Sequence, residues 1–245
     1  MSHIFKTYLD AVTEQLNAAI DENEAELEKA SEVIAQAIID DKNYFLFGSG
    51  HSALIAREAF WRAGGLAPAM PIPDIMEGDV ERLPGHGLAI LAHYNVQPGD
   101  VIIIISNSGI NHLPIEIAMK CKEIGLTVIA LTSKKHSATV TPRHPSGKRL
   151  MEIADIVIDN QVVRGDAMLP LSDERFKVGA SSTILGAFAI QAITARASEI
   201  MLEKGHTPPL LISANTPEGD EHNKSIADKY RSRLIRFAIP TVDAK

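Results

Sequence analysis

The sequence predicts an α/β fold in which parallel strands alternate with helices. Two observations carry this prediction. Short runs of β-branched or aromatic residues end abruptly in small polar residues, and after several of these runs apolar residues recur at helical spacing. The clearest run is residues 101–105, all valine or isoleucine, which ends in Ser106-Asn107-Ser108-Gly109. Such a run is typical of a strand that is covered on both faces of a parallel sheet.

The N-terminal segment carries apolar residues at helical spacing from residue 4 to residue 38, which predicts one long helix or two. The acidic residues between 21 and 28 fit the solvated face of one unbroken helix, and a break near Asn23 is the alternative. An unbroken helix would be about 57 Å long. A helix of that length favours packing on a second subunit, so we expect a homodimer or a homotetramer.

The remaining elements follow from the same patterns. Further strands are predicted at residues 44–47, 127–133 and 156–159. A helix follows residue 52, and a second has Pro114 in its first turn; they end at the glycines of positions 64 and 125, where glycine commonly terminates a helix. Residues 65–99, rich in proline, are predicted to be a long connection with one helical piece at 88–94, and residues 160–176 to be irregular. A buried helix follows Ser181 and Ser182, and the segment 205–245 ends in a basic helix.

Composition narrows the class of partner. The 245 residues are 45% hydrophobic, which allows one sizeable core over residues 1–204, with 205–245 packing on it or on a neighbouring subunit. A net charge of −7 and 5% aromatic residues argue against nucleic acid and favour a small molecule. Aliphatic runs reach only five residues, far below the roughly 20 of a membrane span. No basic and apolar leader is recognisable at the N-terminus, so we expect a cytoplasmic protein.

The strand ends are the candidate binding site. Hydroxyl and backbone N–H groups at 106–109 would meet the positive end of the next helix dipole, which suits a phosphate monoester. The turn 48–52 has the same chemistry. The stretch between Ser133 and Leu150 contains five lysines or arginines and no acidic residue. This charge indicates a lid over an anionic ligand. The side chains expected to face the ligand are Arg143, His144, Ser146 and Lys148. Helix capping and a solvated basic loop are the alternatives.

The sequence gives weaker support for two other kinds of site, a dinucleotide site and a metal site. Gly48, Gly50 and Ala53 satisfy a relaxed dinucleotide fingerprint, whose acidic residue would be Asp74. Asp74 lies in proline-rich, loop-like sequence, so a nicotinamide-dependent oxidoreductase is a remote alternative. The sequence contains no His-Glu-x-x-His motif and no tight pair of cysteine and histidine, and we expect neither a metal ion nor a cofactor.

Three segments together resemble the sugar isomerase (SIS) domain: residues 48–52, 106–109 and 128–133, each at the end of a predicted strand. The resemblance covers about residues 1–204 and is strongest to a bacterial branch that carries the stretch 143–148 and Asp220-x-His222-Asn223. It implies a three-layer α/β/α sandwich on a mainly parallel five-stranded sheet, flavodoxin-like, with a phosphosugar site shared between subunits.

The resemblance also implies roles for residues. Ser106, Asn107, Ser108 and Gly109 match the phosphate-binding loop of the family, Ser52 matches the hydroxyl of the first turn, and Asn111 stands where many members have threonine. Several members take a catalytic base from the late helix, where this chain has Gln191. Related etherases take a glutamate from the connection after the first helix, and Glu81 is our candidate. The remaining expected contacts to the substrate are Ser133, Arg143, Lys148, Ser181 and Ser182.

These residues lead to a hypothesis for function. Glu81 would remove the proton beside the carbonyl of a sugar phosphate, and His51 or His144 would open the ring or protonate the oxygen. The resulting enediolate serves a phosphosugar isomerase or a lyase. The alternative is a non-catalytic phosphosugar sensor, which would act through a protein partner because no helix-turn-helix is recognisable at either end.

Overall fold

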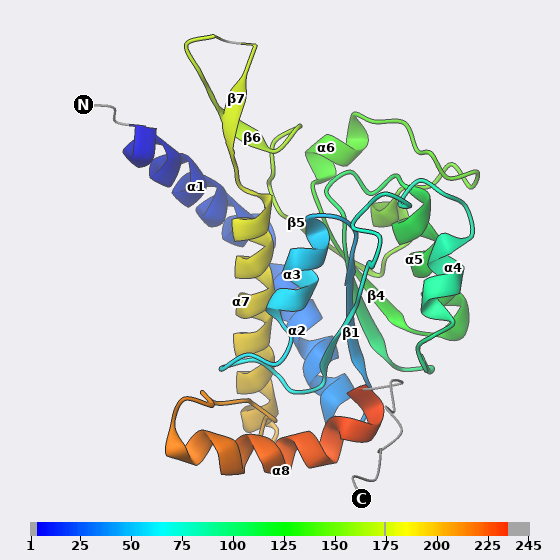
Figure 1. Cartoon of the computed structure of the whole chain (residues 1–245), viewed down its shortest axis with the longest axis vertical. Coiled ribbons are helices and arrows are strands. Elements are labelled where there is room, and N and C mark those ends of the chain that lie inside the picture. Colours follow the sequence, from blue (N-terminus) through cyan, green and yellow to red (C-terminus); the bar gives the residue numbers. More distant parts are fainter. Residues whose placement is uncertain (1–3, 174, 235–245) are drawn as a thin grey trace, which may run out of the picture.

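A parallel sheet lies between two layers of helices in the computed structural model, which describes residues 4–173 and 175–234 (Figure 1). The sheet has five strands in the order β2-β1-β3-β4-β5, and each neighbouring pair is parallel. The strands are β1 (Tyr44–Gly48), β2 (Ala69–Ile72), β3 (Val101–Ile105), β4 (Thr127–Thr132) and β5 (Ile156–Asp159). This is the flavodoxin-like order, and it confirms the predicted three-layer α/β class.

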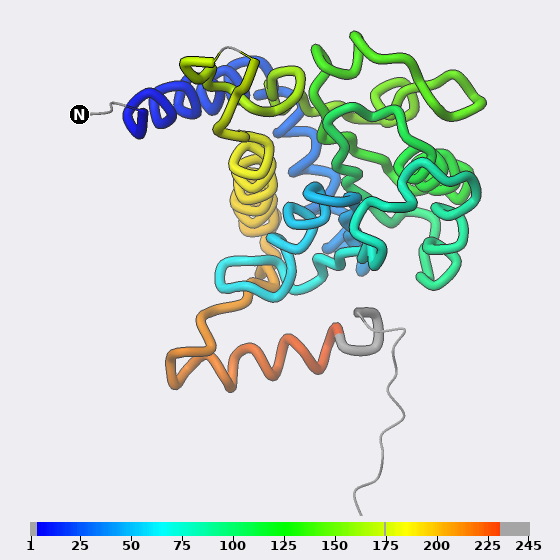
Figure 2. Tube along the Cα trace, turned by 45° about the horizontal axis from the view of Figure 1, so that its top comes forward, coloured from blue at the N-terminus to red at the C-terminus, as the bar shows by residue number. Residues whose placement is uncertain are grey.

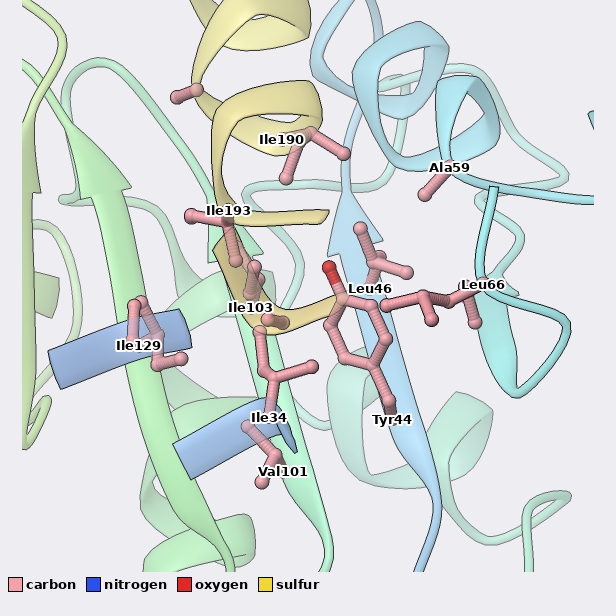
Figure 3. Close-up of a cluster of buried hydrophobic side chains, with 14 of the residues drawn as sticks. Ile34, Tyr44, Leu46, Ala59, Leu66, Val101, Ile103, Ile129, Ile190 and Ile193 are labelled. Carbon is pink, nitrogen blue, oxygen red and sulfur yellow. The ribbon is translucent and has the colours of Figure 1, made fainter. Parts of the chain in front are cut away.

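Alternate residues of the strands face the two helical layers. Ile103 belongs to the core under α2 (Glu24–Ile39), α3 (Ser52–Glu58) and α7 (Ser182–Glu203), where Figure 3 shows it near Ile193 and Tyr44. Ile102 and Ile104 belong to the opposite core, under α4 (His86–Leu91), α5 (His112–Ile124) and the short 3-10 helix Leu150–Glu152. Both faces of β3 are therefore buried, as its unbroken aliphatic sequence predicts.

Helix α7 explains the long apolar stretch near the C-terminal third of the chain. By length and composition it could cross a membrane. In the structure it packs along α2 and over the sheet, and many of its residues, among them Leu185, Ile190 and Ile193, are buried. It is thus a core helix of this fold (Figure 1).

The N-terminal segment forms two helices, α1 (Ile4–Asp21) and α2, so the alternative with a break near Asn23 is correct. Asn23 is fully buried. Its Nδ2 donates to Ala19 O at 2.7 Å and to Asp159 O at 2.8 Å, and its Oδ1 accepts from Asp159 N at 2.7 Å. The Asn23 side chain thus takes the place of a backbone donor for Ala19 O at the helix break, and it connects the break to the end of β5.

Four elements differ from the sequence-based prediction. β2 lies in the stretch that we expected to be a loop. Pro71 is tolerated because β2 is at the edge of the sheet, where, among the described strands, it pairs with β1 alone. The stretch 160–176 is partly regular, since β6 (Ala167–Pro170) forms an antiparallel pair with β7 (Lys177–Ala180). A short helix, α6 (Lys134–Ala138), follows β4.

The C-terminal helix α8 (Pro217–Leu234) packs on its own chain. Tyr230 is buried in a small apolar cluster with Ala67 and Leu211. The Nε2 atom of His222 lies 2.8 Å from Leu210 O, and the side chain of Asn223 exchanges two hydrogen bonds with the backbone of Ile212. Figure 2 shows α8 crossing the end of the molecule at which α7 ends.

Candidate functional site

The carboxyl ends of β1 and β3 meet at the point where the strand order reverses, which is where ligands bind in open α/β sheets. Gly48 pairs with Ile105, so the turns after the two strands lie side by side. Gly48 is required for the first turn, because a Cβ there would lie 2.4 Å from Ser52 O. Between the turns is a cavity of about 190 Å³ lined by Ser49, Ser52, Glu81, Ile105, Ser106, Asn107, Ser108, Asn111, Pro114 and His136.

Several polar groups of this cavity have no partner within residues 4–173 and 175–234. The hydroxyls of Ser52 and Ser108 make no hydrogen bond there, and the backbone N–H groups of Asn107 and Ser108 donate none. Asn107 Oδ1 accepts from Asn160 Nδ2 at 2.6 Å, which leaves the Nδ2 hydrogens of Asn107 available. Ser106 Oγ accepts from Gly109 N at 3.2 Å. These donors lie beside the start of α5, where the helix dipole favours negative charge.

Glu81 is tied to the start of α5 by its side chain and its backbone. Its Oε1 accepts from Asn111 Nδ2 at 2.7 Å, and its carbonyl accepts from Leu113 N at 3.1 Å. Burial raises the pKa of Glu81, opposed by Arg82 and Arg143 and reinforced by Asp74. A carboxylate with a raised pKa in a polar cavity has the properties of a general base.

His136 is a lining residue that the sequence analysis missed. It lies on α6, and burial followed by the charge of Arg164 lowers its pKa, so the neutral imidazole is favoured. The sequence feature that could have identified His136 is its position just after the end of β4, at the same edge of the sheet as residues 106–109. Ser49 was missed in the same way, although the first turn itself was identified.

The structure also gives Asn111 a different contact from the one expected. Its Nδ2 faces Glu81, and its Oδ1 accepts from the guanidinium of Arg143. Asn111 therefore connects Arg143 to Glu81. Arg143 reaches the site through this amide, whereas Lys148 is exposed and does not line the cavity.

Three expected serines lie outside the cavity. Ser133 is fully buried, and its Oγ donates to Val162 O at 2.7 Å and accepts from His136 N at 3.1 Å, so it caps α6. At the start of α7 the N–H groups of Ser181 and Ser182 both donate to Asp166 Oδ1, and Ser182 Oγ donates to Asp166 Oδ2 at 2.6 Å. Asp166 thus already occupies that helix terminus with a negative charge.

The two expected histidines are also elsewhere. His51 is exposed and lines a separate cavity of about 260 Å³ with Asp74 and Glu77. The ring of His144 packs edge-on against the ring of His112, with 5.2 Å between the centroids. Neither histidine lines the cavity that contains Glu81.

Asp74 does follow the second strand, as a dinucleotide fingerprint requires, but its carboxylate is used by the protein itself. It accepts from Ser49 Oγ at 2.7 Å, Gly50 N at 3.1 Å and Gly78 N at 2.8 Å. Asp74 is buried and holds the first turn in shape. It is therefore not free to bind the ribose of a nicotinamide cofactor.

Comparison with known proteins identifies the family. The family model of the SIS domain matches residues 7–133. A UPF0309 protein of Shouchella clausii is 37% identical over 244 residues, which cover 96% of this chain and 99% of that protein. The chain belongs to the SIS domain family. The predicted membership is thereby confirmed.

Solved structures agree with the SIS fold. A phosphoheptose isomerase from Francisella tularensis superimposes with a TM-score of 0.53 at 14% identity, covering 81% of this chain and all of the other. The sugar isomerase domain of an RpiR transcription factor from Sphaerobacter thermophilus gives a TM-score of 0.52 at 17% identity, covering 94% and 99%. The fold thus occurs in proteins named as an isomerase and as a regulator.

Proposed function

We propose that this SIS protein binds a sugar phosphate in the cavity at the ends of β1 and β3 and converts it through an enediolate, as an isomerase or a lyase. The single observation that carries the proposal is the set of uncommitted donors around one small cavity: the hydroxyls of Ser52 and Ser108, and the backbone N–H groups of Asn107 and Ser108. A phosphate monoester offers the acceptor oxygens that these donors lack.

The positions of Glu81 and His136 support the chemical part of the proposal. Both line the cavity that would hold the phosphate, and the sugar carbons would extend from the phosphate toward them. The Glu81 carboxylate takes the proton from the carbon beside the carbonyl, and a ring N–H of His136 donates a hydrogen bond to the carbonyl oxygen, which carries the charge of the enediolate. To complete an isomerisation, the neutral ring of His136 gives this N–H proton to that oxygen while its other nitrogen takes the proton of the hydroxyl on the neighbouring carbon, and the Glu81 carboxyl returns its proton to the former carbonyl carbon. Loss of a substituent next to the enediolate, with a proton supplied to it, completes an elimination.

The pKa directions fit these roles. A raised pKa makes Glu81 a stronger base near neutral pH, and a lowered pKa keeps His136 uncharged, with one N–H donor and one acceptor nitrogen. His51 and His144, which the sequence favoured, have no place in this scheme, because neither lines the cavity.

The test begins with ligand binding. Thermal-shift measurements against a panel of sugar phosphates should reveal a ligand that stabilises the protein, by about 2.7 kcal/mol at a hundredfold excess over Kd. Inorganic phosphate and the unphosphorylated sugars are the matched controls. If the unphosphorylated sugar stabilises as well as its phosphate, the proposed orientation is refuted.

Catalysis is tested on the ligand that binds. In D₂O the enzyme should introduce deuterium at the carbon beside the carbonyl, detected by NMR. Binding without any exchange would contradict the catalytic proposal and would favour the phosphosugar sensor.

A further inference from the structure

A second cluster of polar side chains lies next to the cavity and plays no part in the function proposed above. It consists of His112 and Glu116 on α5 and His144 on the loop that follows α6. One ligand atom from each of the three residues lies within 4.8 Å of the others. From this cluster we propose that the protein binds a divalent transition-metal ion of the zinc class.

The buried nitrogen of His112 is the first argument. Its Nδ1 is shielded from solvent, has no hydrogen-bond partner among the described residues, and lies 3.9 Å from Glu116 Oε1. A buried polar atom without a partner is unfavourable. A metal ion between this nitrogen and the carboxylate would satisfy both.

Glu116 is held in a fixed orientation. Its Oε1 accepts from Gly85 N at 2.6 Å and its Oε2 from Gly87 N at 2.9 Å, both at the start of α4. A Cβ at position 87 would lie 3.0 Å from Glu116 Oε2, so glycine permits this approach. These contacts leave further lone pairs on the carboxylate. Fixed orientation of a ligand by a second layer of hydrogen bonds is typical of metal sites.

His144 is oriented in the same manner. Its Nδ1 accepts from the backbone N–H of Ser146 at 3.1 Å and lies 2.8 Å from Ser146 Oγ, and these two contacts fix the ring. Metal binding through Nε2 would shift the ring proton to Nδ1, which would then donate to Ser146 Oγ in place of the contact with Ser146 N. Two imidazoles and one carboxylate are a known set of three protein ligands for zinc, and in such sites water or a substrate takes the fourth coordination position. Glu116 and His144 also line a cavity of about 670 Å³, which gives an ion access to the cluster.

The start of α5 and the loop after α6 contact each other at two successive positions. Asn111 contacts Arg143, and the next residues, His112 and His144, pack ring against ring. A metal ion at the cluster would therefore fasten the loop carrying Arg143 to the start of α5. This inference concerns metal binding alone and does not depend on the proposed catalysis.

The test uses the full-length, metal-stripped protein with Zn²⁺ or Co²⁺ alone. Calorimetry should find one ion bound per chain, and Co²⁺ should give the visible absorption of a site with nitrogen and oxygen ligands. His144→Ala removes a ligand from a loop and should weaken binding by at least about 100-fold, more than the loss of an outer-shell partner.

His206→Ala is the matched control, because His206 is exposed and lies outside the cluster. It should leave the affinity unchanged. As a second readout, bound Zn²⁺ should slow tryptic cleavage at the exposed Arg143 and Lys148 in the wild type but not in His144→Ala. Absence of a bound ion, or equal effects of the two substitutions, would overturn the proposal.

Discussion

Glu81 and Asn111 are joined by a hydrogen bond of 2.7 Å between Oε1 and Nδ2, across 30 residues of sequence. Asn111 is in turn held by Arg143. A carboxylate on a connection is thereby fixed at the edge of a cavity, in contact with an amide whose other end is bound to a cation. The arrangement keeps Glu81 in one position while its burial still raises its pKa.

Glu81→Gln should abolish deuterium exchange while leaving ligand binding intact. The substitution keeps the shape of the side chain and an oxygen for Asn111 but removes the base, so we expect exchange to fall by about 10²- to 10⁴-fold. NMR in D₂O and a thermal shift with ligand measure the two properties. Retained exchange would disprove the assignment of Glu81.

The same variant should be at least as stable as the wild type near neutral pH. Because burial raises the pKa of Glu81 in the folded state, protonation stabilises the fold at low pH, and that contribution is lost as the pH rises through the raised pKa. Glutamine does not ionise, so the variant does not lose this part of the free energy of unfolding at neutral pH. Denaturant unfolding of both proteins at acidic and neutral pH should show the difference closing toward acidic pH.

Asn111→Ala should shift the pH dependence of exchange. Asn111 donates to the ionised carboxylate, so its removal disfavours ionisation and should raise the pKa of Glu81 further. The acidic limb of the profile should then move to higher pH. A uniform loss of rate with an unmoved profile would indicate mere damage to the site.

Ser52→Ala and Ser108→Ala should each weaken sugar-phosphate binding by about 10- to 100-fold, the equivalent of one hydrogen bond to a charged group. Both hydroxyls line the cavity and are uncommitted. Ser133→Ala is the matched control, because that hydroxyl bonds Val162 and His136 within the protein. It should lower stability and leave affinity nearly unchanged. Calorimetry distinguishes the two outcomes.

The sequence predicted the core strands well because β3 and the middle of β4 are short runs of aliphatic residues, which are typical of buried parallel strands. It missed β2 because Pro71 is normally a sign of a loop, and only the position of β2 at the sheet edge makes proline acceptable. The break at Asn23 depends on a contact with Asp159, far away in sequence. Local periodicity cannot reveal such a contact.

The candidate site was predicted only in part, because it too depends on contacts between residues that are far apart in the sequence. A serine that binds a ligand and a serine that caps a helix look alike in the sequence. Ser133 and Ser182 differ from Ser108 because their hydroxyls bond to residues brought near by the fold. His136 carried no motif of its own. Its role depends on the turn into α6, which brings it back to the ends of the central strands.

Asn23→Ala should lower the free energy of unfolding by about 1–3 kcal/mol, because the substitution leaves buried backbone groups of Asp159 without partners. Asn17→Ala, on the same segment, is the control, since residue 17 is exposed. Urea unfolding of both variants measures the effect. Equal stabilities would show that the contact with β5 does not hold the break between α1 and α2.

His136→Gln should slow exchange by about 10²- to 10⁴-fold with little change in affinity, whereas His51→Gln should affect neither. His136 lines the cavity with Glu81, and its lowered pKa keeps it neutral, so glutamine replaces a donor of similar reach but cannot transfer a proton. Since Glu81 remains, the acidic limb that reports its ionisation should persist in the residual rate. Loss of exchange in His51→Gln but not in His136→Gln would place the proton donor in the neighbouring cavity beside Asp74 and would restore the role that the sequence suggested for His51.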